Sequence, residues 1–182
     1  MMAPVRLFGS IGLALLGIAL LLMISPSALA DVKVEGWRDL SYEYRITNIG
    51  DFPDYVFLAS SAIWGFEYTT LINSSGRFGG GYKLDQFVVH AVRASEFDQE
   101  RFLSQEDERG TFNCTGYCQS IEGLVTSNLT LPRSTSVEEI LPLERIEVLL
   151  EVEGITERGL DISRRAMLYY YQNGTVQELL PD

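Results

Sequence analysis

His90 is the only histidine of this 182-residue chain, so any histidine-dependent catalysis would have to use it. It lies in the β-favouring run Phe87–Val92 with Asp85 nearby in sequence. A Ser-His-Asp arrangement is defined by geometry, and the G-x-S-x-G nucleophile elbow does not occur in this sequence. Two interpretations of His90 therefore stand: the base of a hydrolase, and a strand histidine held by a structural hydrogen bond.

Carboxylates offer a second route to hydrolysis, because a pair of them can act as acid and nucleophile. With 25 Asp and Glu residues, however, the sequence singles out no particular pair. The acidic side chains of residues 96–108 invite a calcium interpretation, but they lack the spacing and the central glycine of an EF-hand loop. We expect a solvated helix face there, and the sequence predicts no metal and no cofactor.

The two cysteines, Cys114 and Cys118, lie in one short segment. An even number of cysteines in an exported chain favours a disulfide, and a bridge across three residues would stiffen a local turn. Neither the Cys-x-x-Cys spacing nor the βαβ context of a redox motif is present. A metal site is disfavoured because the single histidine lies in another segment.

Four Asn-x-Ser/Thr sequons occur without proline at the middle position, and they begin at Asn73, Asn113, Asn128 and Asn173. In an exported protein of a glycosylating organism these asparagines would be surface acceptors for N-linked glycans. The alternative is chance combined with the preference of asparagine for turns.

Aromatic side chains give the best hint of binding. Trp64, Phe66 and Tyr68 would share one face of a strand over Ile63–Ile72, and Tyr169 and Tyr171 would share a face of another. Such rings could form a platform for a sugar or a protein partner. The alternative is that they fill the core of an aromatic-rich domain.

Composition excludes one class of function. The chain has 14 basic and 25 acidic residues and a formal net charge of −11. Such a surface repels phosphate backbones, so nucleic-acid binding has no electrostatic support.

The N-terminal stretch decides the expected compartment. Arg6 precedes an apolar run, Pro26 ends it, and Ala28 and Ala30 form an A-x-A-like cleavage site before Asp31. This is the plan of a secretory signal peptide over residues 1–30, with a single extracytoplasmic domain over residues 31–182. The apolar run, residues 7–24, is also long enough to act as an uncleaved membrane anchor. Export is expected whether or not the segment is cleaved. Contact with a membrane is expected only through an uncleaved segment.

Alternation of apolar and polar residues predicts short strands along the domain. Residues 41–48 and 55–58 read as strands that flank turn residues, which predicts a β-hairpin between them. Residues 82–93, 124–131 and 145–155 follow as further strands, and the glycine-rich residues 73–81 as a flexible turn. Asn173-Gly174 between two β-favouring runs predicts a final hairpin.

One short helix is expected between Ala94 and Arg109, where Phe97, Phe102 and Leu103 recur at roughly helical spacing. Ser95 could cap its start, with Asp98 three residues later.

The stretch YEYRITNIGDFPDYVFLAS, followed by FVVHAV and SEFD, resembles small exported or membrane-associated prokaryotic proteins that share a Phe/Tyr-Pro-Asp-Tyr-Val segment after a strand. The resemblance covers residues 42–98. No function is known for these proteins, so the resemblance implies export and nothing about catalysis.

Together these patterns predict an all-β fold, an antiparallel β-sandwich or barrel-like domain with one short helix, preceded by a hydrophobic signal or anchor helix. For function we expect a non-enzymatic exported module that binds a protein or glycan at the cell surface. The alternatives are an extracytoplasmic hydrolase using carboxylates or His90, and a purely structural envelope protein.

Overall fold

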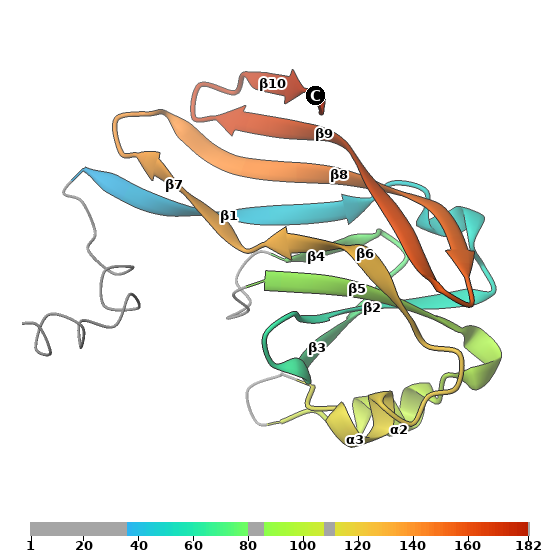
Figure 1. The fold of residues 1–182 in the computed structure, drawn as a ribbon. Coiled ribbons are helices and arrows are strands. Elements are labelled where there is room, and N and C mark those ends of the chain that lie inside the picture. The colour runs from blue at the N-terminus through green and yellow to red at the C-terminus, as the bar shows by residue number, and fades with distance from the viewer. Residues whose placement is uncertain (1–35, 80–85, 108–111, 182) are drawn as a thin grey trace, which may run out of the picture. The chain divides into compact units, whose positions relative to one another are not determined.

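The computed structural model describes residues 36–79, 86–107 and 112–181 (Figure 1). By its internal contacts the chain divides into Met1–Glu35 and Gly36–Asp182. The predicted leader and its cleavage residues Ala28, Ala30 and Asp31 lie outside the described residues. Within the described ranges, no helix is both long enough and apolar enough to cross a membrane.

The described domain is mostly β-sheet, as the alternation predicts. Its strands are β1 (Trp37–Ile46), β2 (Tyr55–Ser61), β3 (Gly65–Ile72), β4 (Arg77–Gly79), β5 (Gln86–Arg93), β6 (Val125–Pro132), β7 (Ser134–Glu138), β8 (Leu143–Thr156), β9 (Gly159–Tyr171) and β10 (Val176–Leu179). Its helices are the 3₁₀ turns η2 (Ile49–Asp51) and η3 (Ala94–Glu96) and the α-helices α2 (Gln99–Leu103) and α3 (Thr115–Cys118).

The strands form one mixed sheet in the order β3-β2-β5-β6-β9-β8-β1-β4, with β10 added to β9 and β7 to β1. The prediction of a purely antiparallel sheet is wrong, because β1 pairs with β8 in parallel and β6 touches β9 in parallel. Parallel pairs join strands that are distant in the chain, and alternation alone does not reveal them.

The predicted hairpin between β1 and β2 is also wrong. Strand β1 pairs with β4, β7 and β8, whereas β2 pairs with β3 and β5. The turn residues form the 3₁₀ turn η2, in which the Asp51 N–H donates to Asn48 O at 3.0 Å. At the end of β1 the Thr47 N–H donates to Leu150 O at 2.8 Å. That bond continues the pairing with β8, so the chain leaves β1 towards a different part of the sheet.

The final hairpin is confirmed. Strands β9 and β10 pair in antiparallel fashion around Asn173 and Gly174. Gly174 has a φ of +82°, a conformation that glycine adopts at little cost.

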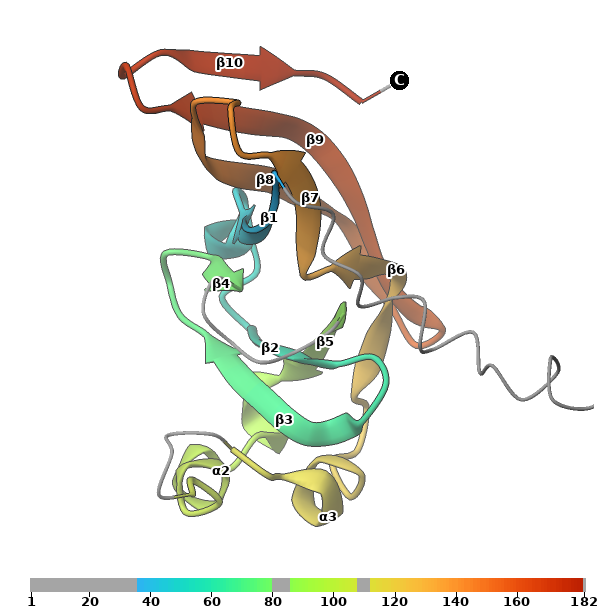
Figure 2. The same cartoon turned by 90° about the vertical axis from the view of Figure 1, so that its left-hand side faces the viewer.

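Two hydrophobic clusters stabilise the domain. The larger core lies between β1, β8 and β9 on one side and β2, β5 and β6 on the other, and includes Tyr44, Phe87 and Leu150. The smaller core covers the opposite side of β2, β3 and β5, where Leu58 and Val92 meet α2 and α3. Figure 2 shows these layers, with both helices on the side of β3 that faces away from β8 and β9.

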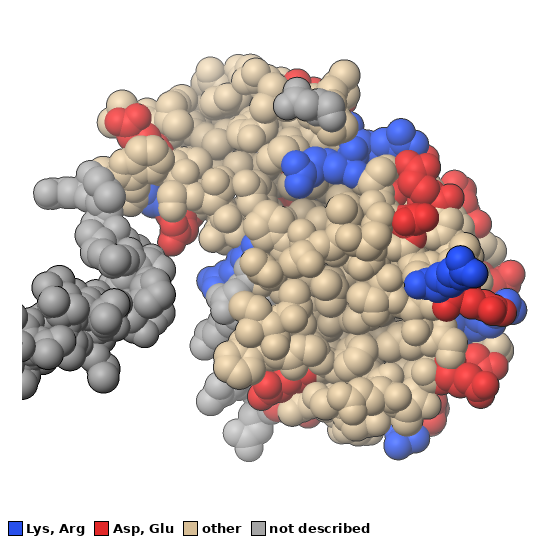
Figure 3. All heavy atoms as spheres, viewed as in Figure 1, with Lys and Arg blue, Asp and Glu red and all other residues tan. Residues whose placement is uncertain are grey.

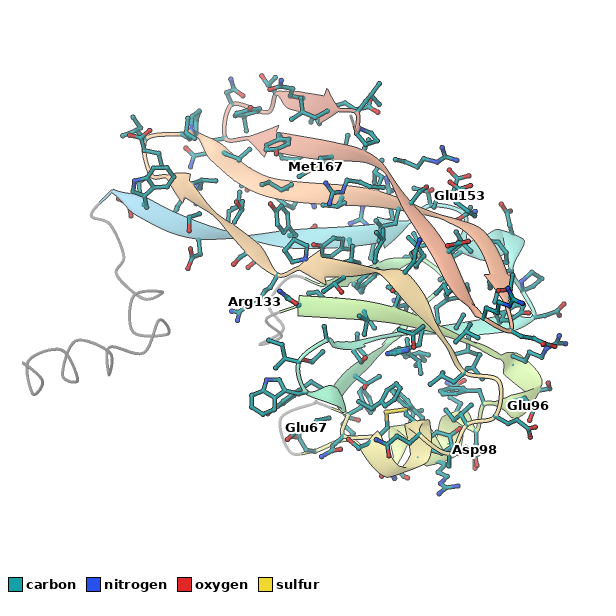
Figure 4. The ribbon with its side chains drawn as sticks, viewed as in Figure 1. Glu67, Glu96, Asp98, Arg133, Glu153 and Met167 are labelled. Carbon is teal, nitrogen blue, oxygen red and sulfur yellow. A yellow bond between two sulfur atoms is a disulfide. The ribbon has the colours of Figure 1, made fainter. Side chains whose placement is uncertain are left out.

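The helical segment differs from its prediction in detail. A 3₁₀ turn and then α2 replace a single helix, and Asp98, not Ser95, caps α2 by accepting from the Arg101 N–H at 2.9 Å. Buried Phe102 anchors α2 in the smaller core. The second α-helix, α3, was not predicted; it carries the Cys114–Cys118 disulfide, whose Cα atoms are 5.4 Å apart, drawn as the yellow bond in Figure 4.

Candidate functional site

The turn between β2 and β3 presents two large apolar side chains to solvent. Ile63 and Trp64 are each 58% exposed. The Oγ of buried Ser61 accepts from the N–H groups of Ile63 at 3.3 Å and Trp64 at 3.1 Å, and the Ala62 N–H donates to Gln86 O at 3.0 Å. These bonds tie the turn to the sheet, so the exposed side chains sit on an ordered backbone. We call Ile63 and Trp64 the hairpin tip.

The three predicted binding aromatics do not form one continuous face. Strand β3 begins at Gly65 and not at Ile63, which places Trp64 in the turn. Phe66 is partly buried and packs on the smaller core, whereas Tyr68 is 37% exposed. Figure 4 labels Glu67, which lies between them on β3. Trp64 is therefore exposed at the hairpin tip, whereas Phe66 packs into the smaller core from the same hairpin.

His90 lies under Phe66, with ring centroids 4.7 Å apart, and only 4% of the histidine is exposed. Its Nε2 is 2.6 Å from Ser60 Oγ and its Nδ1 is 2.9 Å from Thr126 Oγ1. A neutral imidazole can donate from one nitrogen and accept at the other, so both hydroxyls can be partners. Burial lowers the pKa of His90 from 6.5 to about 4, which keeps the ring neutral at pH 7.

This arrangement has part of the geometry of nucleophilic catalysis. Ser60 and His90 are within hydrogen-bonding distance, but Ser60 is fully buried, and Thr126 takes the place where a triad has a carboxylate. Among the described residues, no carboxylate hydrogen-bonds to His90. In this conformation the buried His90 and Ser60 are hydrogen-bonded to each other, and exposed Thr126 closes the far side of the imidazole.

A buried carboxylate is the site residue that sequence reasoning missed. Glu147 is 1% exposed; its Oε1 lies 3.2 Å from Arg45 Nε and 3.5 Å from Arg77 Nη2, and its Oε2 accepts from the Tyr170 hydroxyl at 2.7 Å. The Arg45 contact is ionic, since neither atom makes a hydrogen bond. The Tyr170 ring also stacks under the Arg145 guanidinium at 3.9 Å.

Along β8, Glu147 alternates with the apolar Ile146 and Val148, and this pattern gives no sign that the carboxylate is buried. The arginines that cover it come from β1 and β4. Strand β1 pairs with β8 in parallel and with β4, although these strands are distant in the chain. This pairing brings the arginines over Glu147 and explains its burial.

Tyr169 and Tyr171 are partly buried and pack against the larger core, whereas the predicted glycosylation and acidic positions lie on the surface. The four sequon asparagines are all exposed, as are most of the acidic side chains near α2, including labelled Glu96 and Asp98. No group of three or more His, Cys, Asp or Glu side chains among the described residues is placed to hold a metal ion. On the face seen in Figure 3, charged side chains gather towards the right, whereas the middle, over β5 and β6, is uncharged.

Comparison with known proteins adds no assignment: no family model, curated protein or solved structure matches this chain.

Proposed function

We propose that this chain is an exported, non-catalytic binding module that contacts a protein or glycan partner at the cell surface through the hairpin tip. The observation that carries the proposal is the 58% exposure of Trp64 on a turn fixed by the Ser61 hydroxyl. Tryptophan offers a large contact area and loses little conformational freedom on binding, which makes it a common anchor of interfaces.

The surroundings of the tip fit a neutral partner. Exposed Tyr68 and the carboxylate of Glu67 on β3 can supply polar contacts at the rim of such an interface. The net charge of −11 disfavours polyanionic partners such as nucleic acids. A Trp ring with a nearby tyrosine and carboxylate suits the apolar face and the hydroxyls of a sugar, and suits a protein surface equally.

We also propose that the domain has a sandwich-like architecture and that it is located outside the cytoplasm. The larger core lies between two halves of the sheet, as in a sandwich. This scaffold would hold the hairpin tip in a fixed position on the domain. Export rests on the leader pattern of residues 1–30 and on the resemblance of residues 42–98 to small exported proteins. The domain would be secreted after cleavage, or held at the membrane by an uncleaved segment.

Binding to the organism's own envelopes tests the proposal. The labelled full chain, its Trp64→Ala variant and its Trp37→Ala variant would be sedimented with washed envelopes. Trp37, the other tryptophan, is 45% exposed on β1 and serves as the matched control. We expect Trp64→Ala to weaken binding at least tenfold and Trp37→Ala to leave it unchanged. Equal binding by all three proteins contradicts the proposal.

The chemical class of the partner follows from the same assay. Protease treatment of the envelopes abolishes binding if the partner is a protein, and periodate oxidation abolishes it if the partner is a glycan with vicinal hydroxyls.

A serine hydrolase is the second candidate, because Ser60 Oγ lies 2.6 Å from His90 Nε2. It requires a conformation in which Phe66 moves away and exposes Ser60. A fluorophosphonate probe would then label the wild-type chain and not Ser60→Ala. Absence of labelling in both removes this candidate.

A further inference from the structure

At three of the four sequons the exposed asparagine accepts a hydrogen bond from the backbone N–H two residues later. At Asn73, between β3 and β4, the side-chain Oδ1 accepts from the Ser75 N–H at 2.9 Å and from the Ser75 hydroxyl at 2.5 Å. The sequon thus forms an Asx-turn in which the hydroxyl lies directly beside the carboxamide.

Asn113, just before α3, repeats both bonds, and Asn173 repeats the backbone bond alone. Asn113 Oδ1 accepts from the Thr115 N–H at 3.4 Å and the Thr115 hydroxyl at 3.1 Å. Asn173 Oδ1 accepts from the Thr175 N–H at 2.9 Å in the β9–β10 turn. Among the described residues, the amide nitrogens of these asparagines donate no hydrogen bond, so they are available to an incoming enzyme.

Asn128 is held differently, although it is also exposed. It lies within β6, which pairs with β5 on one edge and meets β9 at Ser127 on the other. Its Nδ2 donates to Asp161 Oδ1 at 3.0 Å, and its Oδ1 accepts from the Ile162 N–H at 3.0 Å. The register of β6 with β5 shifts at this position, and the carboxamide bridges β6 to β9, so the Asn128 side chain cannot enter an enzyme without breaking these two bonds.

We propose that Asn73, Asn113 and Asn173 carry N-linked glycans and that Asn128 does not. The inference rests on the export that is part of the proposed function. Exposed loops can leave the protein surface to enter a transferase, whereas the Asn128 carboxamide is tied to β9 by two hydrogen bonds.

The modification needs a lipid-linked oligosaccharide as co-substrate. The asparagine Nδ2 forms a bond to the anomeric carbon of the sugar, and the bond between that carbon and the phosphate oxygen breaks. The lipid phosphate leaves with the electron pair, and the amide proton passes to a base of the transferase. No oxidation or reduction takes place.

Two of the three sites, Asn73 and Asn173, lie away from the hairpin tip, whereas Asn113 lies beside β3, where the Thr69 N–H donates to Phe112 O at 3.1 Å. Asn73 follows the last residue of β3, whereas Trp64 precedes the first, and an eight-residue strand separates them by about 26 Å. Asn173 lies on the β9–β10 turn, in a different half of the sheet. Glycans at Asn73 and Asn173 would increase solubility and leave the proposed binding surface open.

Glycopeptide mass spectrometry of the full chain from its source organism tests the proposal, with medium, envelope and cytoplasm analysed separately. We expect sugar on Asn73, Asn113 and Asn173 and an unmodified Asn128 peptide in the exported fractions. An exported chain without sugar on Asn73, Asn113 and Asn173 overturns the inference and leaves the binding function standing. A chain found only in the cytoplasm overturns both.

Variants that remove the sequon hydroxyl test which asparagines are glycosylated. They keep the asparagine itself and abolish only its recognition as a sequon. Ser75→Ala, Thr115→Ala and Thr175→Ala should each lower the intact mass by one glycan. Thr130→Ala, the matched control in the Asn128 sequon, should leave the mass unchanged. Loss of a glycan in Thr130→Ala would overturn the claim that the bonds to β9 protect Asn128.

Discussion

The domain buries a histidine and a glutamate by opposite means. His90, in the smaller core, is neutral and meets two hydroxyls and an aromatic ring. Glu147, on the outer side of β8, meets two guanidinium groups and a phenol. A neutral ring needs only hydrogen-bond partners, whereas a buried carboxylate also needs opposite charge, since its desolvation costs several kcal/mol.

The contrast between these buried side chains and the exposed Trp64 guides where we place the binding surface. Both groups have their hydrogen-bonding or charge needs met inside the protein, and both are at most 4% exposed. Buried side chains whose needs are met in this way contribute to the specificity of the fold. The exposed Trp64 has no such partner, which is why we place binding at the hairpin tip and not at either buried site.

The largest effect is expected at Glu147. Glu147→Ala leaves partly buried Arg45 and exposed Arg77 without their counter-charge; because solvent reaches both guanidinium groups, the cost should lie near the lower end of the about 3–5 kcal/mol of a fully buried pair. Glu43→Ala is the matched control, because Glu43 pairs with Arg145 at 3.0 Å while its side chain is 39% exposed; its cost should stay below about 1 kcal/mol. Urea unfolding measures both, and equal losses would contradict the ionic account.

The His90 site should show itself through pH. The pKa of His90 is about 4 in the folded chain and near 6.5 when unfolded, so the unfolded state binds a proton first as pH falls. Between pH 6.5 and 4 the difference of about 2.5 units removes about 3 kcal/mol of stability; above pH 6.5 it has no effect. His90→Gln should lack this part of the pH dependence. Parallel stability profiles for the two proteins would contradict the assignment.

Removal of the disulfide tests whether the regions around His90 and around Glu147 unfold independently. Cys114 and Cys118 are fully buried in the smaller core, and opening their short loop costs about 2 kcal/mol. In the Cys114→Ala/Cys118→Ala variant, amide exchange should accelerate in α2 and α3, while the β8–β9 ladder beside Glu147 keeps its protection. Uniform acceleration would mean that both regions unfold together.

The smallest effect separates two neighbouring tyrosines. The Tyr170 hydroxyl donates to buried Glu147, a bond that also raises the pKa of Tyr170, whereas the Tyr171 hydroxyl donates to exposed Gln177 at 3.0 Å. Tyr170→Phe should cost about 1 kcal/mol and Tyr171→Phe close to none. Thermal unfolding of the two variants measures the difference, and a reversed order would remove Tyr170 from the Glu147 site.

Local signals in the sequence predicted local structure well. Asn173-Gly174 predicted its hairpin, and the alternation of residues 145–155 predicted most of β8. Strands β4 and β7 were missed, since three and five residues without a marked apolar alternation give little signal.

Non-local pairing explains what the sequence could not predict. The turn after β1 looked like a hairpin turn, yet β1 pairs with a strand about 100 residues away. The same pairing buries Glu147 beneath arginines from other strands, and the partners of His90 come from β2 and β6. Exposure of the tip was likewise not predictable, because the pattern of Trp64, Phe66 and Tyr68 is equally typical of a core.

Fluorescence of Trp64 tests the binding account most directly. In the Trp37→Phe protein, Trp64 is the only tryptophan, and adding the organism's washed envelopes should shift its emission to shorter wavelength and protect it from acrylamide quenching. In the Trp64→Phe protein, the emission of Trp37 should not change. An unchanged Trp64 signal at envelope concentrations that bind the labelled chain would contradict the claim that the hairpin tip is the contact.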